Sequence, residues 1–285
     1  MVQEAYQIKY AFKVDNTVQL NLSLSLFIAP GQLQYAVFEG TTPQVIELAD
    51  INIQQQFLDE KALLDMISLV LHNQFLDRRK FEKVNISFLN GHFTLLPEAF
   101  AAEADLKRLL HFTTGAGDHM KAAQHKTKYC DFCYALPADW LDFFGKTFPN
   151  ASIRHAGAVS IQLLFEQFSL ADKQVFINLH AGQMELAVKN EKQLQFYNAF
   201  AFETKEDILY YLLFAMEQLQ LNPLLCKLAI AAEVETSDDL IKSLKKYVKH
   251  VDFCVFDQTI LSKPTQYQQA AHYYFTVLNQ HLCAL

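Results

Sequence analysis

The sequence predicts an α/β protein in which one structural unit is written twice. Residues 29–37 and 180–188, which lie 151 positions apart (180 minus 29), share a Gly-Gln pair, an alternation of apolar and polar residues, and a final Ala-Val. Each stretch is followed by the same order of further elements, which a duplication explains. Early strands joined by short turns indicate antiparallel pairing, whereas later strands that alternate with helices indicate parallel pairing. We therefore expect two mixed sheets covered by helices.

Each copy begins with three strands in an antiparallel meander. The repeated stretch reads as a strand, a turn that contains Gly31 or Gly182, and a second strand. The third strand is Val45–Leu48 in the first copy and Phe196–Ala199 in the second. Short strands joined by turns that contain glycine are typical of β-hairpins.

A helix and a buried strand follow the meander in each copy. Apolar residues recur at helical spacing over Glu60–Phe75 and over Lys205–Leu219, which predicts two helices. The short runs Lys83–Ile86 and Lys227–Ile230 come next and match each other in position. We expect them to form buried strands.

A further helix, a strand and a last helix complete each copy. The last strands are predicted at Asp131–Tyr134 and Asp252–Val255, which align with each other. The helix before the strand is clearest at Ser237–Lys249, where the first residue can cap and two aspartates favour the positive end of the helix dipole. The closing helices are predicted at Ala138–Phe148 and Thr265–Leu282, each after a proline.

The predicted unit is therefore β-β-β-α-β-α-β-α in both copies. Ser152–Phe168 is expected to form a strand and a helix that connect them. The predicted domains are residues 1–157, the first lobe, and residues 158–285, the second lobe. A cleft is expected between the two lobes.

Composition and charge exclude several classes of function. The chain has 285 residues, a net charge of -7 and 51% hydrophobic residues, which argues against disorder and against nucleic-acid binding. The longest apolar run, Ile208–Met216, is too short to span a membrane. The amino terminus lacks a basic start followed by an apolar stretch, and five cysteines suit a reducing compartment. The sequence therefore predicts a cytoplasmic protein without a transmembrane segment.

The duplicated unit resembles the actin-like ATPase (ribonuclease H-like) fold, whose members include sugar kinases, the cell-division protein FtsA and the pilus-assembly protein PilM. Residues 129–137 and 148–155 resemble an uncharacterised bacterial family with a degenerate version of this fold. The resemblance covers nearly the whole chain and implies two lobes around a central cleft. It rests on topology, so it does not name a reaction.

Active members of the actin-like group carry an acidic residue near the end of the first strand of each lobe, where Mg²⁺ is held beside a hairpin around the phosphates. When Gly31 and Gly182 are laid on those hairpins, Phe27 and Asn178 take the acidic positions. Neither residue supplies an anionic oxygen for a hard cation. The resemblance therefore implies candidate cleft hairpins without metal ligands, at Gly31, Gln32, Asn178, His180, Gly182 and Gln183.

The adenosine site of the group has paired glycines where a later strand of the second lobe meets its helix. This chain has Ala231, Ala232 and Glu233 in that place. The side chains fill the gap, and the carboxylate repels a polyphosphate. We expect no catalytic residue, no metal and no cofactor, with ATP and Mg²⁺ as the less favoured alternative.

A Cys-x-x-Cys pair, Cys130 and Cys133, follows His119 and His125, and such a combination can bind zinc. Residues three apart on a strand point to opposite faces. Cys133 also aligns with Cys254, which has no cysteine partner nearby. We therefore favour buried structural thiols over zinc binding or redox chemistry.

Three other patterns have a functional and a structural interpretation. His155 could act as a general base, but without a catalytic motif nearby a hydrogen-bonded structural histidine is favoured. Thr113–Asp118 resembles a phosphate cradle that lacks a following lysine, and a surface loop is favoured. Lysines share one face of the Lys242–Lys249 segment, which favours a solvated amphipathic helix over a site for an acidic partner or a lipid headgroup.

Two hypotheses about function follow. The first is a noncatalytic actin-like scaffold that binds another protein, because the architecture is kept while the catalytic carboxylates are missing. A partner surface could use four tyrosines, Tyr210, Tyr211, Tyr273 and Tyr274. The second is a divergent nucleotide-binding phosphotransferase or ATP-dependent switch, which would need Glu185 or Glu233 to reach the cleft.

Overall fold

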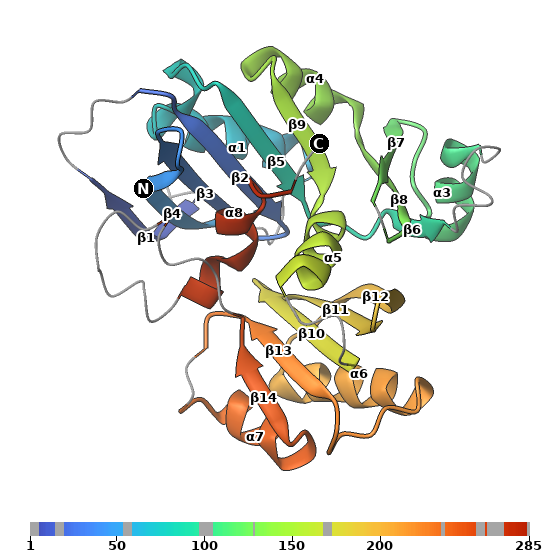
Figure 1. The fold of residues 1–285 in the computed structure, drawn as a ribbon. Helices are drawn as coiled ribbons and strands as arrows, with labels where there is room; N and C mark the ends of the chain where they lie inside the picture. Colours follow the sequence, from blue (N-terminus) through green and yellow to red (C-terminus); the bar gives the residue numbers. More distant parts are fainter. Residues whose placement is uncertain are drawn as a thin grey trace, which may run out of the picture.

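The computed structural model has two lobes that are joined through a layer of helices (Figure 1). The first lobe contains a six-stranded sheet and a small three-stranded sheet, and the second lobe contains a five-stranded sheet. The structure describes residues 6–14, 20–53, 59–96, 105–127, 129–167, 173–234, 237–254, 260 and 271–283.

The first lobe is built on a six-stranded mixed sheet. Its strands are β1 (Tyr6–Lys13), β2 (Ser23–Ala29), β3 (Gln32–Glu39), β4 (Gln44–Ile53), β5 (Lys83–Phe88) and β9 (Ala151–His155). They lie in the order β1-β4-β3-β2-β5-β9. The meander β2-β3-β4 is antiparallel, whereas β5 and β9 continue the sheet in parallel beside β2. β1 adds an antiparallel edge strand that was not among the predicted elements.

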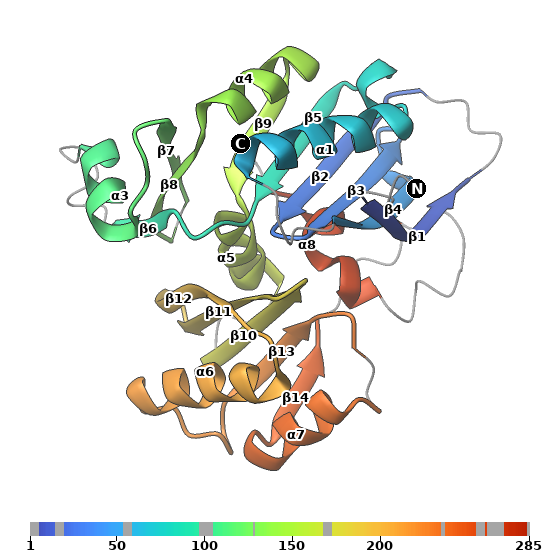
Figure 2. The ribbon, with the colours of Figure 1, turned by 180° about the vertical axis from the view of Figure 1, so that it is seen from behind.

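Two helices, α1 (Glu60–Asn73) and α4 (Ala138–Thr147), cover one face of this sheet (Figure 2). α1 begins after Asp59, whose carboxylate accepts a hydrogen bond from the backbone N of Ala62 at 2.8 Å. Such a cap satisfies a backbone donor that has no partner within the helix. A short 3₁₀ helix, η1 (Leu76–Arg78), follows α1. The side chains that α1 buries are Ile67, Val70 and Leu71.

The second lobe is built on a five-stranded mixed sheet. Its strands are β10 (Lys173–His180), β11 (Gln183–Asn190), β12 (Gln193–Ala201), β13 (Lys227–Ala231) and β14 (His250–Phe253). They lie in the order β12-β11-β10-β13-β14. The helices α6 (Lys205–Gln218) and α7 (Asp239–Tyr247) cover the face that points away from the first lobe (Figure 1). α7 thus starts two residues after the predicted position, with Asp238 at its N-cap.

The two large sheets share one topology. The order β4-β3-β2-β5-β9 in the first lobe matches β12-β11-β10-β13-β14 in the second, with the same mixture of antiparallel and parallel pairs. A β-bulge falls at the same step of both meanders, after Val37 in β3 and after Val188 in β11. These two valines are 151 positions apart (188 minus 37), as the repeat predicts.

The repeated glycines lie at equivalent turns. Gly31 joins β2 to β3 with a φ of 76°, and Gly182 joins β10 to β11 with a φ of 70°. The carbonyl of Gly31 accepts a hydrogen bond from the backbone N of Ile53 at 2.9 Å, and that of Gly182 accepts one from Phe202 at 3.0 Å. A positive φ favours glycine at both turns. The prediction of a duplicated α/β fold is confirmed.

A small sheet interrupts the first copy of the unit. It consists of β6 (Phe93–Leu96), β7 (Met120–Lys126) and β8 (Asp131–Pro137), all antiparallel, and α3 (Leu106–Thr114) packs against it. The predicted match of Asp131–Tyr134 with Asp252–Val255 was wrong, because Asp131–Tyr134 lies in β8. The equivalent of β14 is β9, since each pairs in parallel with the inner strand of its sheet. A short apolar run does not reveal which sheet it joins.

The insertion also changes the correspondence of the helices. α4 precedes β9 as α7 precedes β14, so the interpretation of Ala138–Phe148 as a closing helix was wrong. The closing helix of the first copy is α5 (Ala156–Gln167). The segment Ser152–Phe168, which was expected to connect the two copies, therefore belongs to the first copy as its last strand and its closing helix. In the second copy, η4 (Ala271–Tyr274) and α8 (Phe275–Asn279) lie within the predicted Thr265–Leu282, whose residues 265–270 lie outside the described residues.

α5 and α8 lie side by side between the two large sheets (Figures 1 and 2). α5 contacts β5 and β9 of the first sheet and β11 and β12 of the second. α8 packs on β2 and β3, and its Phe275 ring lies 5.6 Å from that of Phe176 in β10. No helix of the described residues is long and apolar enough to cross a membrane. The division into residues 1–157 and 158–285 stays a prediction.

Gly157, near the start of α5, lies where the first lobe, the small sheet and the second lobe meet. A Cβ atom at this position would stand 2.5 Å from Cζ of Tyr197 and 2.7 Å from Cζ of Phe132. Both rings are buried, so neither can move into solvent. The three parts of the molecule can therefore approach this closely because residue 157 has no side chain.

Gly157→Ala should lower the free energy of unfolding by about 1–3 kcal/mol, because an added methyl group overpacks a filled site. Gly145→Ala is the matched control. Gly145 is exposed on α4 and has no atom within 4 Å of its added Cβ, so alanine should be neutral or stabilise by up to about 1 kcal/mol. Urea unfolding measures both variants, and an unchanged Gly157→Ala protein would contradict the close contact.

Candidate functional site

The hairpins that contain Gly31 and Gly182 approach each other at the cleft between the lobes. Oε1 of Gln32 accepts a hydrogen bond from the backbone N of Ala181 at 3.3 Å. Gln32 is buried, and its Nε2 donates to Oδ1 of Asp50 at 2.8 Å. A cavity of about 250 Å³ beside this contact is lined by residues of both lobes. It is smaller than the roughly 300–1,000 Å³ typical of small-molecule sites.

Phe27 takes the first position at which the resemblance implies an acidic residue in active relatives. It is fully buried in β2, and its ring packs against that of His180 from the opposite lobe, with 4.4 Å between the ring centroids. A phenyl ring has no lone pair to offer a cation. An aromatic contact therefore joins the lobes where a metal-binding carboxylate would lie.

Asn178, at the second such position, is buried and hydrogen-bonded. Its Nδ2 donates to Oε2 of Glu185 at 2.8 Å and to Oγ1 of Thr276 at 2.9 Å. Nε2 of His180 lies 2.9 Å from the same oxygen of Glu185, and the hydroxyl of Tyr197 donates to Oε1 at 2.8 Å. Both oxygens of Glu185 are thus engaged. The network joins β10, β11 and β12 to α8.

Glu185 is a fully buried carboxylate that stays charged. Burial by itself raises the pKa of a carboxyl group, because desolvation disfavours the anion. The hydrogen bond and the electrostatic interaction with His180, together with the Tyr197 hydroxyl, outweigh burial and lower the pKa of Glu185 below its ordinary value. Burial and the Glu185 charge raise the pKa of Tyr197 well above its usual range. Binding a cation would require Glu185 to give up these partners.

Ala231, Ala232 and Glu233 lie at the end of β13, beside Asn178. The two alanines are buried, so their methyl groups fill space that paired glycines would leave open. Glu233 lines the cleft and forms an ion pair with Lys9 of β1, in the first lobe. Both charged side chains are partly exposed. The ion pair spans the cleft at the edge of the first sheet.

The cleft brings only some of the predicted hairpin residues together. Gln32 and His180 line the same cavity, with Ala232 and Glu233 opposite. Gly31 and Gly182 form the turns themselves. Asn178 is buried, while Gln183 is half-buried, and neither lines this cavity. The candidate residues therefore take part in contact between the lobes more than in a continuous ligand surface.

The cysteines do not form a metal site with the neighbouring histidines. In the part of the chain that the structure describes, no three His, Cys, Asp or Glu side chains are placed to hold a metal ion. Cys130 and Cys133 are free thiols, and burial raises the pKa of both, that of Cys133 to about 11. His119 lies 2.9 Å from a carboxylate oxygen of Glu60. The alignment of Cys133 with Cys254 was wrong, because Cys133 lies in β8 of the small sheet, whereas Cys254 directly follows β14 of the second lobe.

His155 is a buried structural histidine. Its Nδ1 accepts a hydrogen bond from the backbone N of Gly157 at 3.0 Å, and Nε2 donates to the carbonyl of Asn90 at 3.0 Å. The ring packs against those of Phe93 and Phe132. Burial lowers the pKa of His155 to about 4. The ring is therefore neutral at neutral pH and joins the first sheet to the small sheet.

Two other predicted patterns have a simple structural place. The segment Thr113–Asp118 contains the end of α3, where Gly115 caps the helix with a φ of 71°. It is not the start of a helix, as a phosphate cradle requires.

The four tyrosines share no exposed surface, since Tyr210 is 62% exposed, Tyr211 and Tyr273 are half-buried, and Tyr274 is buried.

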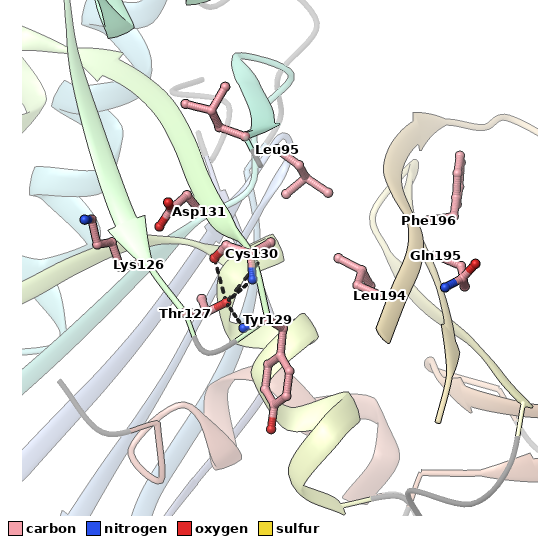
Figure 3. Close-up of a pocket in the computed structure, with 10 residues that line it drawn as sticks. Leu95, Lys126, Thr127, Tyr129, Cys130, Asp131, Leu194, Gln195 and Phe196 are labelled. Atoms are coloured by element: carbon pink, nitrogen blue, oxygen red, sulfur yellow. Dashed lines mark hydrogen bonds between the residues drawn. The ribbon is translucent and has the colours of Figure 1, made fainter. Parts of the chain in front are cut away.

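A larger cavity, of about 520 Å³, lies between the small sheet and the second lobe (Figure 3). We call it the β6–β12 groove. One wall consists of residues from β12, and the other of residues from β6 and the β7–β8 turn. The lining residues are Leu95, Leu96, Lys126, Thr127, Tyr129, Cys130, Asp131, Leu194, Gln195 and Phe196.

Packing and hydrogen bonds hold the walls of the β6–β12 groove. Phe93 of β6 and Tyr197 of β12 meet edge to face, with 5.5 Å between the ring centroids. The hydroxyl of Thr127 accepts hydrogen bonds from the backbone N of Tyr129 at 3.1 Å and of Cys130 at 3.0 Å (Figure 3). The ring of Tyr129 stacks on Phe165 of α5 at 3.9 Å. The groove is therefore largely preformed.

Two strand edges border the β6–β12 groove. Within the described residues, β6 pairs only with β8, and β12 pairs only with β11. An edge strand presents backbone N–H and C=O groups that another chain can use. β12 also bulges at Gln195, because Leu194 pairs with Lys189 while Phe196 pairs with Val188. A bulge re-aims side chains and is common beside functional sites.

Several residues of the cleft and the groove were not among the predicted ones. Lys9 lies in β1, whose alternation of apolar and polar residues over Tyr6–Lys13 is a signal for a strand. Tyr197 and Thr276 had no such signal, because their role depends on Glu185 and Asn178. Of the groove residues, only Tyr129, Cys130 and Asp131 lie in a segment that carries the family resemblance, and the others form no motif.

The family of the chain follows from its sequence. Residues 10–251 match the family described as "Protein of unknown function (DUF3822)". The chain belongs to the DUF3822 family. No curated protein matches this DUF3822 chain in sequence.

Two solved structures resemble the DUF3822 chain in fold. A Bacteroides thetaiotaomicron protein with an actin-like ATPase fold and unknown function is 16% identical, with a TM-score of 0.72 over 85% of this chain and 93% of that one. A chain of the PilM-PilN type IV pilus biogenesis complex is 13% identical, with a TM-score of 0.59 over 90% of this chain and 96% of that one. The predicted actin-like ATPase fold is confirmed.

At pH 7, Glu185→Gln should lower the free energy of unfolding of the DUF3822 protein by about 3 kcal/mol, because it removes the buried carboxylate that Asn178, His180 and Tyr197 contact. The pKa of Glu185 is lower in the folded state. Its stabilisation is therefore complete above the ordinary carboxyl pKa and is lost as the pH falls through the folded-state pKa. Urea unfolding at a series of acidic pH values should show the difference between wild type and variant shrinking.

Glu233→Gln is the matched control in the same cleft. Its carboxylate is half exposed, and its ion pair with Lys9 is screened by water. The free energy of unfolding should fall by less than about 1 kcal/mol. Equal losses in the two variants would show that Glu185 is not the buried anchor of the second lobe.

Proposed function

We propose that this DUF3822 protein is a noncatalytic actin-like scaffold of the bacterial cytoplasm, which binds another protein and does not hydrolyse ATP. The contact between Phe27 and His180 carries the proposal, because it fills the place where active relatives hold Mg²⁺. Behind it, Asn178 and Glu185 are buried and bonded to each other. These contacts favour lobes with a fixed relation over lobes that open and close around a nucleotide.

The β6–β12 groove supports an extended peptide as the contact made by the protein partner. Leucine side chains line both walls, and a strand edge borders each. An added strand would gain main-chain hydrogen bonds, while alternate side chains would enter the cavity. The similar fold in the PilM-PilN complex supports the use of this architecture in a protein assembly. We infer that the occupant is an apolar, extended segment of another protein.

Mg²⁺ and ATP should neither bind tightly nor turn over. Titration calorimetry should detect no micromolar binding, and a phosphate-release assay should detect no hydrolysis. A ligand present at a hundred times its Kd would add about 2.7 kcal/mol to stability, so an unchanged Tm is a second readout. Micromolar binding with turnover would instead support a divergent phosphotransferase that recruits Glu233 after its release from Lys9.

Peptides selected on the purified protein from a displayed library should carry alternating apolar residues. Leu194→Lys should weaken their binding by at least about tenfold, because it places a charge in an apolar wall. Phe112→Lys is the matched control, since Phe112 is 88% exposed on α3 and does not line the groove. An equal loss of peptide affinity in both variants, or an affinity that Leu194→Lys leaves unchanged, would contradict the groove as the binding site.

A further inference from the structure

One end of the second lobe lies opposite the cleft. β13 and β14 begin there, with Lys227 paired to His250, while β13 ends in the cleft at Ala231 (Figure 1). The loop between α6 and β13 also turns at this end, and the backbone N of Lys249 donates to the carbonyl of Pro223 at 3.1 Å. We call this end the lobe-two tip and define it by Leu224, Leu225, Lys245, Lys246, Tyr247 and Lys249.

Apolar side chains project from the lobe-two tip. Leu224 is 61% exposed, Leu225 is 76% exposed and Tyr247 is 52% exposed. The two leucines are held in a turn, because Oδ1 of Asn222 accepts a hydrogen bond from the backbone N of Leu224 at 2.9 Å, and its carbonyl accepts one from Leu225 at 3.0 Å. Single exposed leucines are common, whereas an adjacent exposed pair at the same end of the lobe as an exposed tyrosine is the kind of apolar surface that can mark an interaction site.

The charges of the lobe-two tip oppose the charge of the whole chain. Lys245, Lys246 and Lys249 are exposed in a protein whose net charge is -7. Within the described residues, the ion pair found on α7 is made by Lys242, whose Nζ lies 3.4 Å from Oδ1 of Asp239. This pair lies toward the other end of the helix. Glu217 and Asp252 are the acidic residues nearest the tip on α6 and β14. The tip therefore attracts anions.

The basic residues of the second lobe are all lysines and histidines. The four arginines of the chain lie in the first lobe, at Arg78, Arg79, Arg108 and Arg154. Arginine suits fixed, bidentate contacts with carboxylates, whereas lysine is a point charge on a flexible stem. A set of lysines fits a surface whose anions can move, such as a layer of lipid headgroups, better than one fixed protein partner.

We propose that the lobe-two tip docks on an anionic lipid bilayer. The lysines would lie at the headgroups, and Leu224, Leu225 and Tyr247 would enter the interface between headgroups and acyl chains. This contact is a surface attachment without a membrane-spanning segment. It leaves the cleft free at the opposite end of β13 and is independent of the groove at β12, which is the opposite edge of the sheet from β14.

Co-sedimentation of the purified full chain with vesicles tests the proposal. Vesicles of phosphatidylcholine with phosphatidylglycerol should bind the protein, and vesicles of phosphatidylcholine alone should not. Binding should weaken as salt is added, because exposed charges are screened. In Leu225→Trp, tryptophan emission should shift to shorter wavelength with the anionic vesicles only, since native Trp140 lies in the first lobe.

Charge reversal at two tip lysines should weaken vesicle binding strongly. Each lysine near an anionic surface contributes about fivefold in affinity, so Lys245→Glu with Lys246→Glu should lose at least about tenfold. Leu224→Ser with Leu225→Ser should also weaken binding but keep the salt dependence. The matched control is Lys61→Glu with Lys80→Glu, which makes the same change of charge at exposed lysines of the first lobe and should bind as wild type.

Three results would overturn the proposal. The first is no preference of the wild-type chain for anionic vesicles. The second is an equal loss in the tip variant and in the Lys61 and Lys80 control, which would assign binding to overall charge. The third is binding of soluble polyglutamate at the tip without vesicle binding, which would identify an acidic polypeptide as the occupant.

Discussion

A buried negative charge, that of Glu185, sets the relation between the two lobes. A charge inside a protein is costly unless its partners stay in place. His180, Asn178 and Tyr197 supply those partners from two neighbouring strands, and Asn178 also bonds to Thr276 of α8. Because α8 packs on the first sheet, the partners of this charge also fix how the first lobe sits on the second.

The same contacts determine what the cleft can do. In an actin-like fold the ends of the first strands face each other, and here they present Phe27 against His180. The two rings pack against each other, so this contact holds the lobes together by packing. Lys9 and Glu233 add a charged link at the edge of the cleft. These contacts hold the two lobes together at the centre of the fold.

The small sheet forms one wall of the β6–β12 groove. Its Phe132 and Phe93 rings surround His155, which burial keeps neutral. Together with Gly157, these residues bring the small sheet against Tyr197 of the second lobe. The β6–β12 groove opens beside this junction, so its width depends on packing between three parts of the molecule. The lobe-two tip, in contrast, depends on one lobe only.

The sequence by itself determined the repeated order of elements, because turns and periodicity are local. Gly31 and Gly182 need a positive φ that glycine supplies, and α1 and α6 follow from apolar spacing. Position along the chain also placed Phe27 and Asn178 where the resemblance implies acidic residues. Only the tertiary structure decided that Asp131–Tyr134 joins the small sheet, since a short apolar strand can pair in any sheet. It alone brought Glu185 to its partners, because contacts between distant segments leave no pattern along the chain.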